Sequence, residues 1–306
     1  AVGADGTIYA AGNDMNAYAL NPDGTIKYSY PNVGVCCAAP AVGPDGTIYF
    51  SGNGTTALNP DFTLKWWYPY GICCGSLTIA TDGTLYIGGA WGWLHAVNPA
   101  TGQAKWIFKP ADFSSSVCDG PAIGHDGTVY SLTNKKLYAL NPQDGTVIWS
   151  VSTGNFMPVC SAPFVASDGT IYVAAGQNIN RYSPSGSLMN VISLPSLGFQ
   201  NKFAASILPG TSGNSIIITA YSPPQNGSSL WQNGVIFAVS MNQYLLWSLP
   251  VAGSAIGLQD ISPIMDAAGR IYFTSPIFEE SQSPYPTFNL KYQYLYSIDS
   301  ETGSIL

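Results

Sequence analysis

The chain has 306 residues, of which 46% are hydrophobic and only 9% are charged, and its net charge is −7. So many apolar residues supply a sizeable core, and the low charge with 13% aromatic residues excludes a disordered chain. Ten Lys and Arg residues are too few for a phosphate-binding surface, and no apolar run reaches about eighteen residues, so we expect neither a nucleic-acid partner nor a membrane span.

A short segment, Asp-Gly-Thr followed by an aliphatic residue and Tyr, recurs along the chain. Its Asp stands at Asp5, Asp45, Asp82, Asp126 and Asp168. Degenerate copies follow near residues 212–214 and 268–272. The copies start about 37–55 residues apart, which is typical of the blades of a β-propeller.

Each copy contains four short runs separated by glycine turns, which predicts four antiparallel strands. In the second copy the first run ends at the turn of Asp45 and Gly46, the next two lie within residues 47–50 and 56–60, and the fourth ends at Trp66. Asp-Gly between alternating runs favours a tight hairpin in which both turn residues have positive φ. Four antiparallel strands make one propeller blade.

Seven such blades start near residues 1, 35, 72, 114, 157, 200 and 254. The sequence therefore predicts an all-β fold: a seven-bladed β-propeller of four-stranded antiparallel blades, formed by residues 1–306 as a single domain. An open solenoid or a β-sandwich is the alternative, and the regular repeat argues against a sandwich.

The two ends of the chain interrupt the repeat. Because Ala1 is not an initiator Met, we expect a processed or trimmed product. We also expect the seventh repeat to be incomplete at Leu306. Either a short seam between blades one and seven closes the ring, or a segment of another chain or domain completes it.

Two insertions lengthen the connection between the second and third strands of the last two blades. Residues 221–234 in blade six contain Trp231, and residues 275–293 in blade seven contain Glu279 and Glu280. Long loops in a compact domain are usually functional or disordered. We therefore expect an interaction face here, with a pair of solvated, variable loops as the alternative.

Aromatic residues and glycosylation triplets fall in matching loops of other blades. Trp91 and Trp93 would bind a sugar or a protein if they are exposed, and otherwise they pack between blades. Asn53 and Asn226 each begin an Asn-Gly-Thr or Asn-Gly-Ser triplet that fits the glycosylation acceptor pattern. Glycans are therefore candidate modifications and partners.

The most specific feature after the repeat is a set of six cysteines: Cys36, Cys37, Cys73, Cys74, Cys118 and Cys160. One cysteine in each of four consecutive blades stands eight residues before the repeat's Asp, so we expect an arc of thiols near one mouth of the channel. Disulfides in an oxidising compartment are the leading interpretation. Buried free thiols and a metal site are the alternatives.

The pairing of these cysteines is left open by the sequence. Bonds between adjacent blades would join Cys37 to Cys73 and Cys74 to Cys118. Alternatively, Cys36–Cys37 and Cys73–Cys74 form vicinal rings and Cys118 pairs with Cys160.

No catalytic constellation is evident in the sequence. No Gly-x-Ser-x-Gly segment occurs, and no nucleophile has an evident base. The two histidines, His95 and His125, are expected to serve packing and a turn. Because an Asp-Gly turn recurs in five blades, its carboxylates are turn formers, with a calcium site at one of them as the alternative.

The repeat resembles the PQQ-like (quinoprotein-type) β-propeller repeat in three segments: Asp-Gly-Thr-aliphatic-Tyr, Tyr-Ala-Leu-Asn-Pro and a Trp that closes the blade. The resemblance implies that four such residues pack between blades: Trp66, Trp106, Trp149 and Trp247. The family contains enzymes and many non-catalytic scaffolds, so the fold does not fix the function.

Adjacent cysteines also resemble the vicinal disulfide of quinoprotein dehydrogenases, which would imply PQQ-dependent oxidation. Those enzymes are typically eight-bladed and longer than this chain. They need a calcium-binding set of acids and amides with a catalytic Asp, and the sequence shows no matching constellation.

We therefore predict a secreted, non-catalytic propeller that has no cofactor and serves as a structural, adhesion or assembly module at the cell surface or in an extracellular assembly. A protein partner, or further copies of the chain, would bind through the long-loop face or the seam between blades one and seven. One alternative is a periplasmic or surface protein-binding scaffold, similar in kind to the propeller lipoprotein of bacterial outer-membrane assembly. The other is a PQQ-dependent dehydrogenase-like enzyme that uses PQQ and calcium.

Overall fold

The computed structural model describes residues 1–12, 14–34, 39–52, 54–70, 77–89, 92–111, 120–133, 135–154, 162–211, 213–223, 231–255, 263–280 and 288–306. Within these ranges, only the backbone is described for residues 231–232, 252–255, 275–280 and 288–294.

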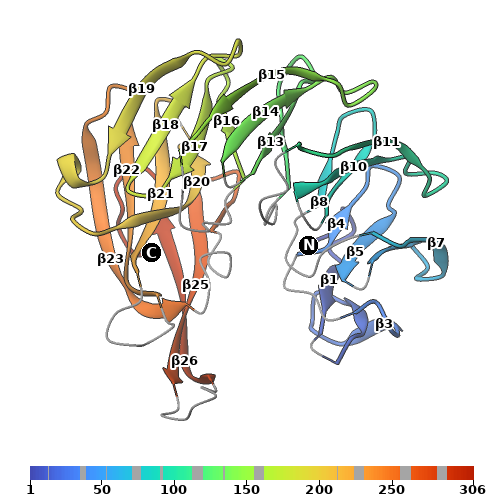
Figure 1. Cartoon of the computed structure of the whole chain (residues 1–306). Helices are drawn as coiled ribbons and strands as arrows, with labels where there is room; N and C mark the ends of the chain where they lie inside the picture. Colours follow the sequence, from blue (N-terminus) through green and yellow to red (C-terminus); the bar gives the residue numbers. More distant parts are fainter. Residues whose placement is uncertain are drawn as a thin grey trace. The chain divides into compact units, whose positions relative to one another are not determined.

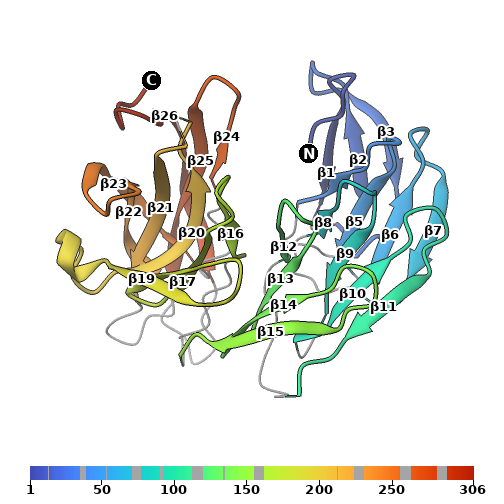
Figure 2. The ribbon, with the colours of Figure 1, turned by 90° about the horizontal axis from the view of Figure 1, so that it is seen from above.

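Antiparallel strands form seven sheets, and the fold is a seven-bladed β-propeller with almost no helix, as predicted (Figure 1). The chain divides into two compact units, residues 1–152 and 153–306. Within each unit the sheets follow one another in chain order (Figure 2). A single domain over residues 1–306 stays a prediction.

The first unit holds blades one to four. Its strands are β1 (Ile8–Ala11), β2 (Ala17–Leu20) and β3 (Ile26–Tyr30) in blade one; β4 (Ala41–Val42), β5 (Ile48–Gly52), β6 (Gly54–Leu58) and β7 (Leu64–Tyr68) in blade two; β8 (Leu77–Ile79), β9 (Leu85–Gly88), β10 (Leu94–Val97) and β11 (Ala104–Phe108) in blade three; and β12 (Ala122–Ile123), β13 (Val129–Leu132), β14 (Lys136–Leu140) and β15 (Val147–Ser152) in blade four.

The second unit holds blades five to seven. Its elements are β16 (Phe164–Val165), β17 (Ile171–Ala175), β18 (Asn178–Tyr182) and β19 (Leu188–Ser193) in blade five, followed by the 3-10 helix η2 (Pro195–Leu197); β20 (Phe203–Pro209), β21 (Ser215–Ser222), β22 (Trp231–Ser240) and β23 (Leu245–Ala255) in blade six; and β24 (Ile264–Met265), β25 (Arg270–Glu280) and β26 (Phe288–Asp299) in blade seven.

Blades one and seven have three regular strands each, and single β-bridges mark the fourth position. In blade one a single bridge joins Val2 to Ile8. This bridge is equivalent to the pair of Val42 in β4 and Ile48 in β5 of blade two. At the other end Ile305 is bridged to Ile298. The four-stranded pattern is thus regular in blades two to six.

The Asp-Gly turns are held by the side chain of their own Asp. Asp45 accepts hydrogen bonds from the backbone N of Thr47 at 3.0 Å and from its Oγ1 at 2.8 Å. The prediction that both turn residues have positive φ is wrong: Gly46 has φ 78°, and no described turn Asp has positive φ. The carboxylate ties down the two residues that follow it, so only the glycine adopts the left-handed conformation.

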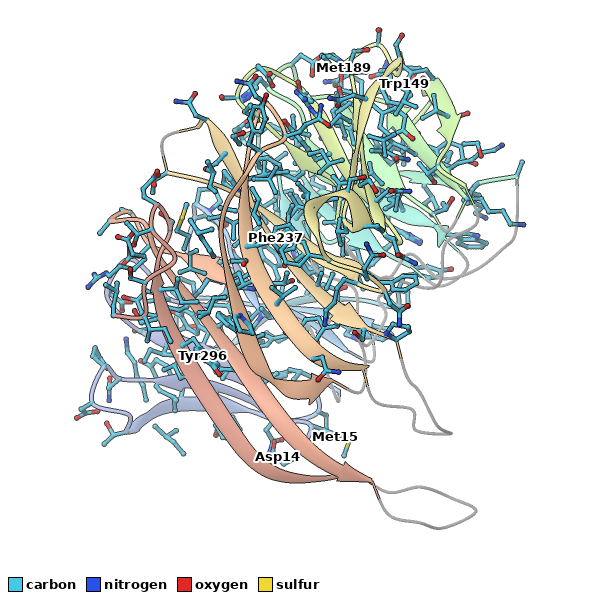
Figure 3. All side chains as sticks on the ribbon, turned by 90° about the vertical axis from the view of Figure 1, so that its left-hand side faces the viewer. Asp14, Met15, Trp149, Met189, Phe237 and Tyr296 are labelled. Atoms are coloured by element: carbon cyan, nitrogen blue, oxygen red, sulfur yellow. The ribbon has the colours of Figure 1, made fainter. Side chains whose placement is uncertain are left out.

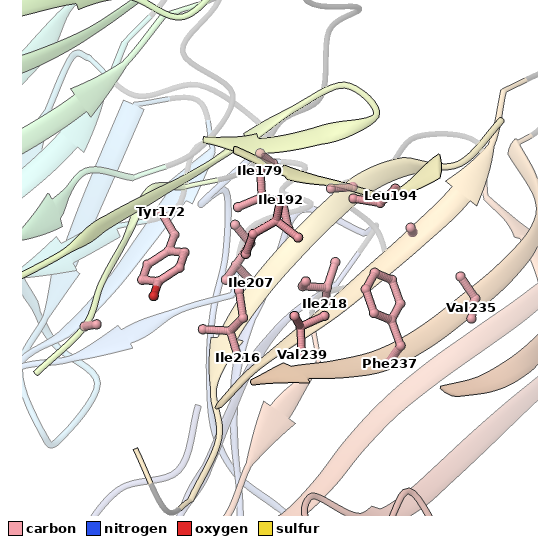
Figure 4. Packing of buried hydrophobic residues seen from close by; sticks show 14 residues of the cluster. Tyr172, Ile179, Ile192, Leu194, Ile207, Ile216, Ile218, Val235, Phe237 and Val239 are labelled. Atoms are coloured by element: carbon pink, nitrogen blue, oxygen red, sulfur yellow. The ribbon is translucent and has the colours of Figure 1, made fainter. Parts of the chain in front are cut away.

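The inner strands of a blade are the most deeply buried, because the neighbouring blades cover both of their faces. All residues of β5, β6, β9, β10, β17 and β21 are buried. In the second unit, Phe237 and Ile218 of blade six pack in one apolar cluster with Ile192 of blade five (Figure 4). Outer strands such as β15 are largely exposed.

The blade-closing residues Trp66, Trp106 and Trp247 contact the next blade in the same way. The indole Nε1 of Trp66 donates to the carbonyl of Pro99 at 2.8 Å, and Trp106 and Trp247 make the equivalent bonds to Pro142 and Ser300. A Cβ placed on Gly102 would lie 2.7 Å from the Trp66 indole. Each indole therefore needs a glycine in the turn that it covers.

Two further outer strands carry aromatic residues. Trp149 lies 5.8 Å from the ring of Tyr130 in its own blade, as Trp66 lies 5.7 Å from Tyr49. In blade one the outer strand carries Tyr28, which stacks on Phe62 of blade two at 6.0 Å. Phe62 has φ 66° and stands where other blades have glycine. A smaller ring on the outer strand is thus matched with a larger side chain in the turn.

Candidate functional site

In the two insertions, the residues that the structure describes lie almost entirely in strands. The ladder of β21 and β22 extends to Ser222 paired with Gln232, and that of β25 and β26 extends to Glu280 paired with Phe288. Our expectation of two long loops is therefore corrected for the described residues. Residues 275–293 contain one Ile, two Phe and two Tyr, which favour paired strands over irregular loops.

The hairpin of blade seven continues beyond the described core contacts of its blade. The rings of Phe273 and Tyr296 stack at 4.8 Å, next to the last of these contacts; Figure 3 labels Tyr296 on this hairpin. After Thr274 opposite Leu295, six further residue pairs follow, from Ser275 opposite Tyr294 to Glu280 opposite Phe288. We call residues 275–280 and 288–294 the arm, and it projects from blade seven (Figure 1).

Blade six carries a groove at the base of its own long hairpin. The groove has a volume of about 480 Å³. Phe199, which follows the helix η2, and Lys202, which directly precedes β20, border it together with residues of β22 and β23. We call it the blade-six groove, and its lining residues are Phe199, Lys202, Asn233, Gly234, Val235, Ser248, Pro250 and Val251. Most of these side chains are apolar, so the groove offers an apolar floor.

A β-bulge shapes this groove. The register of β22 against β23 shifts between Gln232 and Gly234, and Asn233 has φ 51°. A Cβ on Gly234 would lie 2.4 Å from the ring of Tyr221 and 2.6 Å from Val251. The bulge therefore requires glycine, and it turns the carbonyl of Asn233 toward the ammonium of Lys202.

Lys202 is the only cation among the described residues that line the groove. Its Nζ donates to the Oγ of Ser222 at 3.1 Å and to the carbonyl oxygen of Asn233. Burial lowers the pKa of Lys202. Elsewhere Lys27, Lys65 and Lys105 pair with the turn carboxylates of their own blades, whereas the partners of Lys202 in the described part of the chain are neutral.

Aromatic side chains surround a buried histidine in blades two and three. His95 is fully buried, its Nδ1 lies 2.9 Å from the Oη of Tyr68, and Tyr70 stacks on it at 4.8 Å. Trp93 is half-buried, with the ammonium of Lys109 4.0 Å from its ring centroid. Burial, with a smaller contribution from the charge of Lys109, lowers the pKa of His95 to about 4.

A second cavity lies between the turns of blades three and four. It measures about 400 Å³ and is bordered by Asp82, Tyr86, His125 and Asp126 among others. Asp126 accepts hydrogen bonds from Thr128, as the other turn carboxylates do from their threonines. No group of three metal-ligating side chains is found among the described residues, and a calcium site stays an untested alternative.

Several residues singled out in the sequence lie outside the described residues. They are Cys36, Cys37, Cys73, Cys74, Cys118, Cys160, Asn53, Asn226 and Trp91. Trp231 stands on β22 and Glu279 and Glu280 stand on β25, with only their backbone described. The blade-six groove was not predicted, because it depends on a bulge that has no simple sequence pattern.

Comparisons with known proteins agree on the fold. Residues 90–188 match the family model PQQ_2, described as outer membrane protein assembly factor BamB. A quinohemoprotein alcohol dehydrogenase, ADHIIG from Pseudomonas putida HK5, matches 98% of this chain with a TM-score of 0.64 and 12% identity. The match covers 64% of that enzyme's chain, so this chain spans less than two thirds of it.

Two further solved structures have the same fold. The C-terminal WD40 domain of Sif2 matches 89% of this chain and 76% of its own, with a TM-score of 0.67 and 11% identity. BamB from Moraxella catarrhalis matches 87% of this chain and 94% of its own, with a TM-score of 0.52 and 16% identity. These identities support likeness of fold alone. A search of curated proteins finds no significant match.

Proposed function

Because the chain is a β-propeller with PQQ-like repeats, we propose that it is a non-catalytic protein-binding scaffold whose partner docks on the hairpins of blades six and seven. The fold is one that BamB and a WD40 domain share. The likeness to the dehydrogenase is a likeness of fold and brings no activity with it. Among the described residues no helix combines the length and the hydrophobicity of a membrane span.

The observation that carries this proposal is the length of the arm. Its ladder continues through six pairs beyond the stacked rings of Phe273 and Tyr296. A two-stranded ribbon on its own is marginally stable in water, so the arm adds little to the stability of blade seven. Contact with another protein would cover its open strand edges and hold it in place.

We place this scaffold outside the cytoplasm, at the cell surface, in an extracellular assembly or in the periplasm. The six cysteines and the two glycosylation triplets support a location in an oxidising compartment. The family model that matches residues 90–188 is described as an outer membrane protein assembly factor. That description supports a location in the cell envelope. Binding through a seam between blades one and seven, or to glycans, stays a prediction.

Shortening the arm is expected to abolish partner binding and leave the fold intact. Residues 276–293 would be replaced by Asn-Gly, which closes a two-residue hairpin between Ser275 and Tyr294 in the existing register. Because the arm lies beyond the core, the melting temperature should change by less than about 3 °C. Proteins that co-purify with the intact chain from its native cells would be identified, purified and titrated against both forms.

The matched control keeps the strands of the arm and replaces only residues 281–287 with a Gly-Ser linker of equal length. Loss of binding in the shortened form, with the control retaining it, assigns docking to the paired strands. Equal affinity of the intact and shortened chains for the same partner would show that the arm is not the docking element.

A further inference from the structure

The arm carries a sequence that complements the blade-six groove. Glu279 and Glu280 are the only two adjacent acidic residues in the sequence, and two apolar residues, Ile277 and Phe278, precede them directly. Most other acidic residues are Asp in turns, where Thr side chains and backbone amides satisfy them, as at Asp45. The arm thus combines apolar residues and carboxylates on a projecting strand.

The groove offers the opposite chemistry. Its floor is apolar, and its one cation, Lys202, has two neutral hydrogen-bond partners in the described residues. An ammonium has three N–H donors, and the described residues take up two of them, which leaves a third donor that a carboxylate can accept. A carboxylate next to a half-buried ammonium in an apolar pocket makes a stronger contact than it would in water.

The arm and the groove of one copy lie on opposite sides of the blade-six sheet. Along β23, Trp247 and Leu249 pack against the core of blade seven. Ser248 and Pro250 line the groove instead, because successive side chains of a strand point to opposite faces. Val251, which pairs with Gly234 at the bulge, borders both the groove and that core. Blade seven, which bears the arm, therefore covers one face of the sheet, and the groove opens on the other.

We propose that the arm of one copy of this chain docks into the blade-six groove of a second copy, through one face of its strand β25. One apolar residue, Ile277 or Phe278, would lie on the apolar floor, and the carboxylate two residues further on, Glu279 or Glu280, would pair with Lys202. This proposal rests on the proposed docking role of the arm and names its partner. The contact is head-to-tail, so each copy offers one arm and one groove. Such contacts build rings or open filaments.

The test is the concentration dependence of the molecular mass of the full-length chain, measured by sedimentation velocity from about 1 μM to about 0.5 mM. The wild-type chain should form dimers and larger species, and added salt should weaken them. Lys202→Met keeps an apolar side chain in the groove and removes the charge, and Glu279→Gln with Glu280→Gln removes the acidic partners. Each variant should stay monomeric, with an association constant lowered at least tenfold.

A charge swap tests the pairing directly. Lys202→Glu alone and Glu279→Lys with Glu280→Lys alone should each be monomeric, and mixing the two should restore association. A wild-type chain that stays monomeric over the whole range, or association that these variants leave unchanged, would overturn the proposal. If the wild-type chain is monomeric and shortening the arm still abolishes binding of another protein, the self-docking is wrong and the scaffold function stands.

Discussion

Replacing Gly102 with alanine is expected to destabilise the native chain by about 3 kcal/mol. About 1 kcal/mol comes from a side chain at φ 69°, and about 2 kcal/mol comes from forcing a methyl group into the space of the Trp66 indole. The indole has little room to move, because it is buried and its Nε1 is bonded to the carbonyl of Pro99.

Gly24 supplies the matched control for this substitution. It has φ 85° in the equivalent turn of blade one, but a Cβ there would meet nothing within 4 Å. Gly24→Ala should therefore cost only about 1 kcal/mol. Urea unfolding of both variants measures the difference, and equal losses of stability would show that the indole does not restrict the turn.

A double-mutant cycle separates the clash from the backbone strain. In a Trp66→Tyr background the ring is smaller, as Tyr28 is opposite Phe62. Gly102→Ala should then cost about 1–2 kcal/mol less than it does in the wild-type chain. No coupling between the two substitutions would contradict the contact.

The second large effect is a loss of stability in mild acid that depends on His95. Its ordinary pKa of 6.5 falls to about 4 in the folded chain, because burial opposes the charged ring. Between pH 6.5 and pH 4 the unfolded chain binds a proton that the native chain does not, so lowering the pH favours unfolding. The native chain should lose about 2 kcal/mol between pH 7 and pH 5 through this one group.

The measurement is the free energy of unfolding in urea at several pH values in that window. His95→Phe removes the titrating ring and should flatten the pH dependence, while the lost contact with Tyr68 lowers stability equally at every pH. His125→Gln changes the only other histidine in the sequence and is the control. If the wild-type and His95→Phe chains lose the same stability from pH 7 to pH 5, His95 is not the group responsible.

The repeat made the fold predictable. Asp45, Gly46 and Thr47 recur with the same local chemistry in five blades, and each copy indicates a hairpin by itself. The prediction of positive φ at both turn residues was wrong. The hydrogen bonds from Thr47 to the Asp45 carboxylate stabilise a turn other than the one that Asp-Gly usually forms.

The insertions were placed correctly, and their described residues form strands where loops were expected. In blade six the ladder reaches Ser222 and Gln232, and residues 224–230 between them lie outside the described residues. Pairing across a hairpin depends on the partner strand, which a local pattern does not contain. The sequence therefore shows where a hairpin is lengthened, and the register shows how far it extends.

The blade-six groove could not be predicted either, because it also depends on contacts between segments that are far apart in the sequence. Lys202, Gly234 and Pro250 come from three distant segments, and none belongs to the repeat. Only the bulge at Gly234 brings the carbonyl of Asn233 to Lys202. A lone lysine in a chain with ten basic residues gives no sign of such a site.

The most direct test of the scaffold function is amide hydrogen exchange of the intact chain with and without its purified partner. Our account predicts slower exchange in the bound chain along the arm, at residues 275–280 and 288–294, and at the hairpin of β22 and β23. Unchanged exchange in the arm, with protection confined to the Asp-Gly turns of blades two to four, would contradict it.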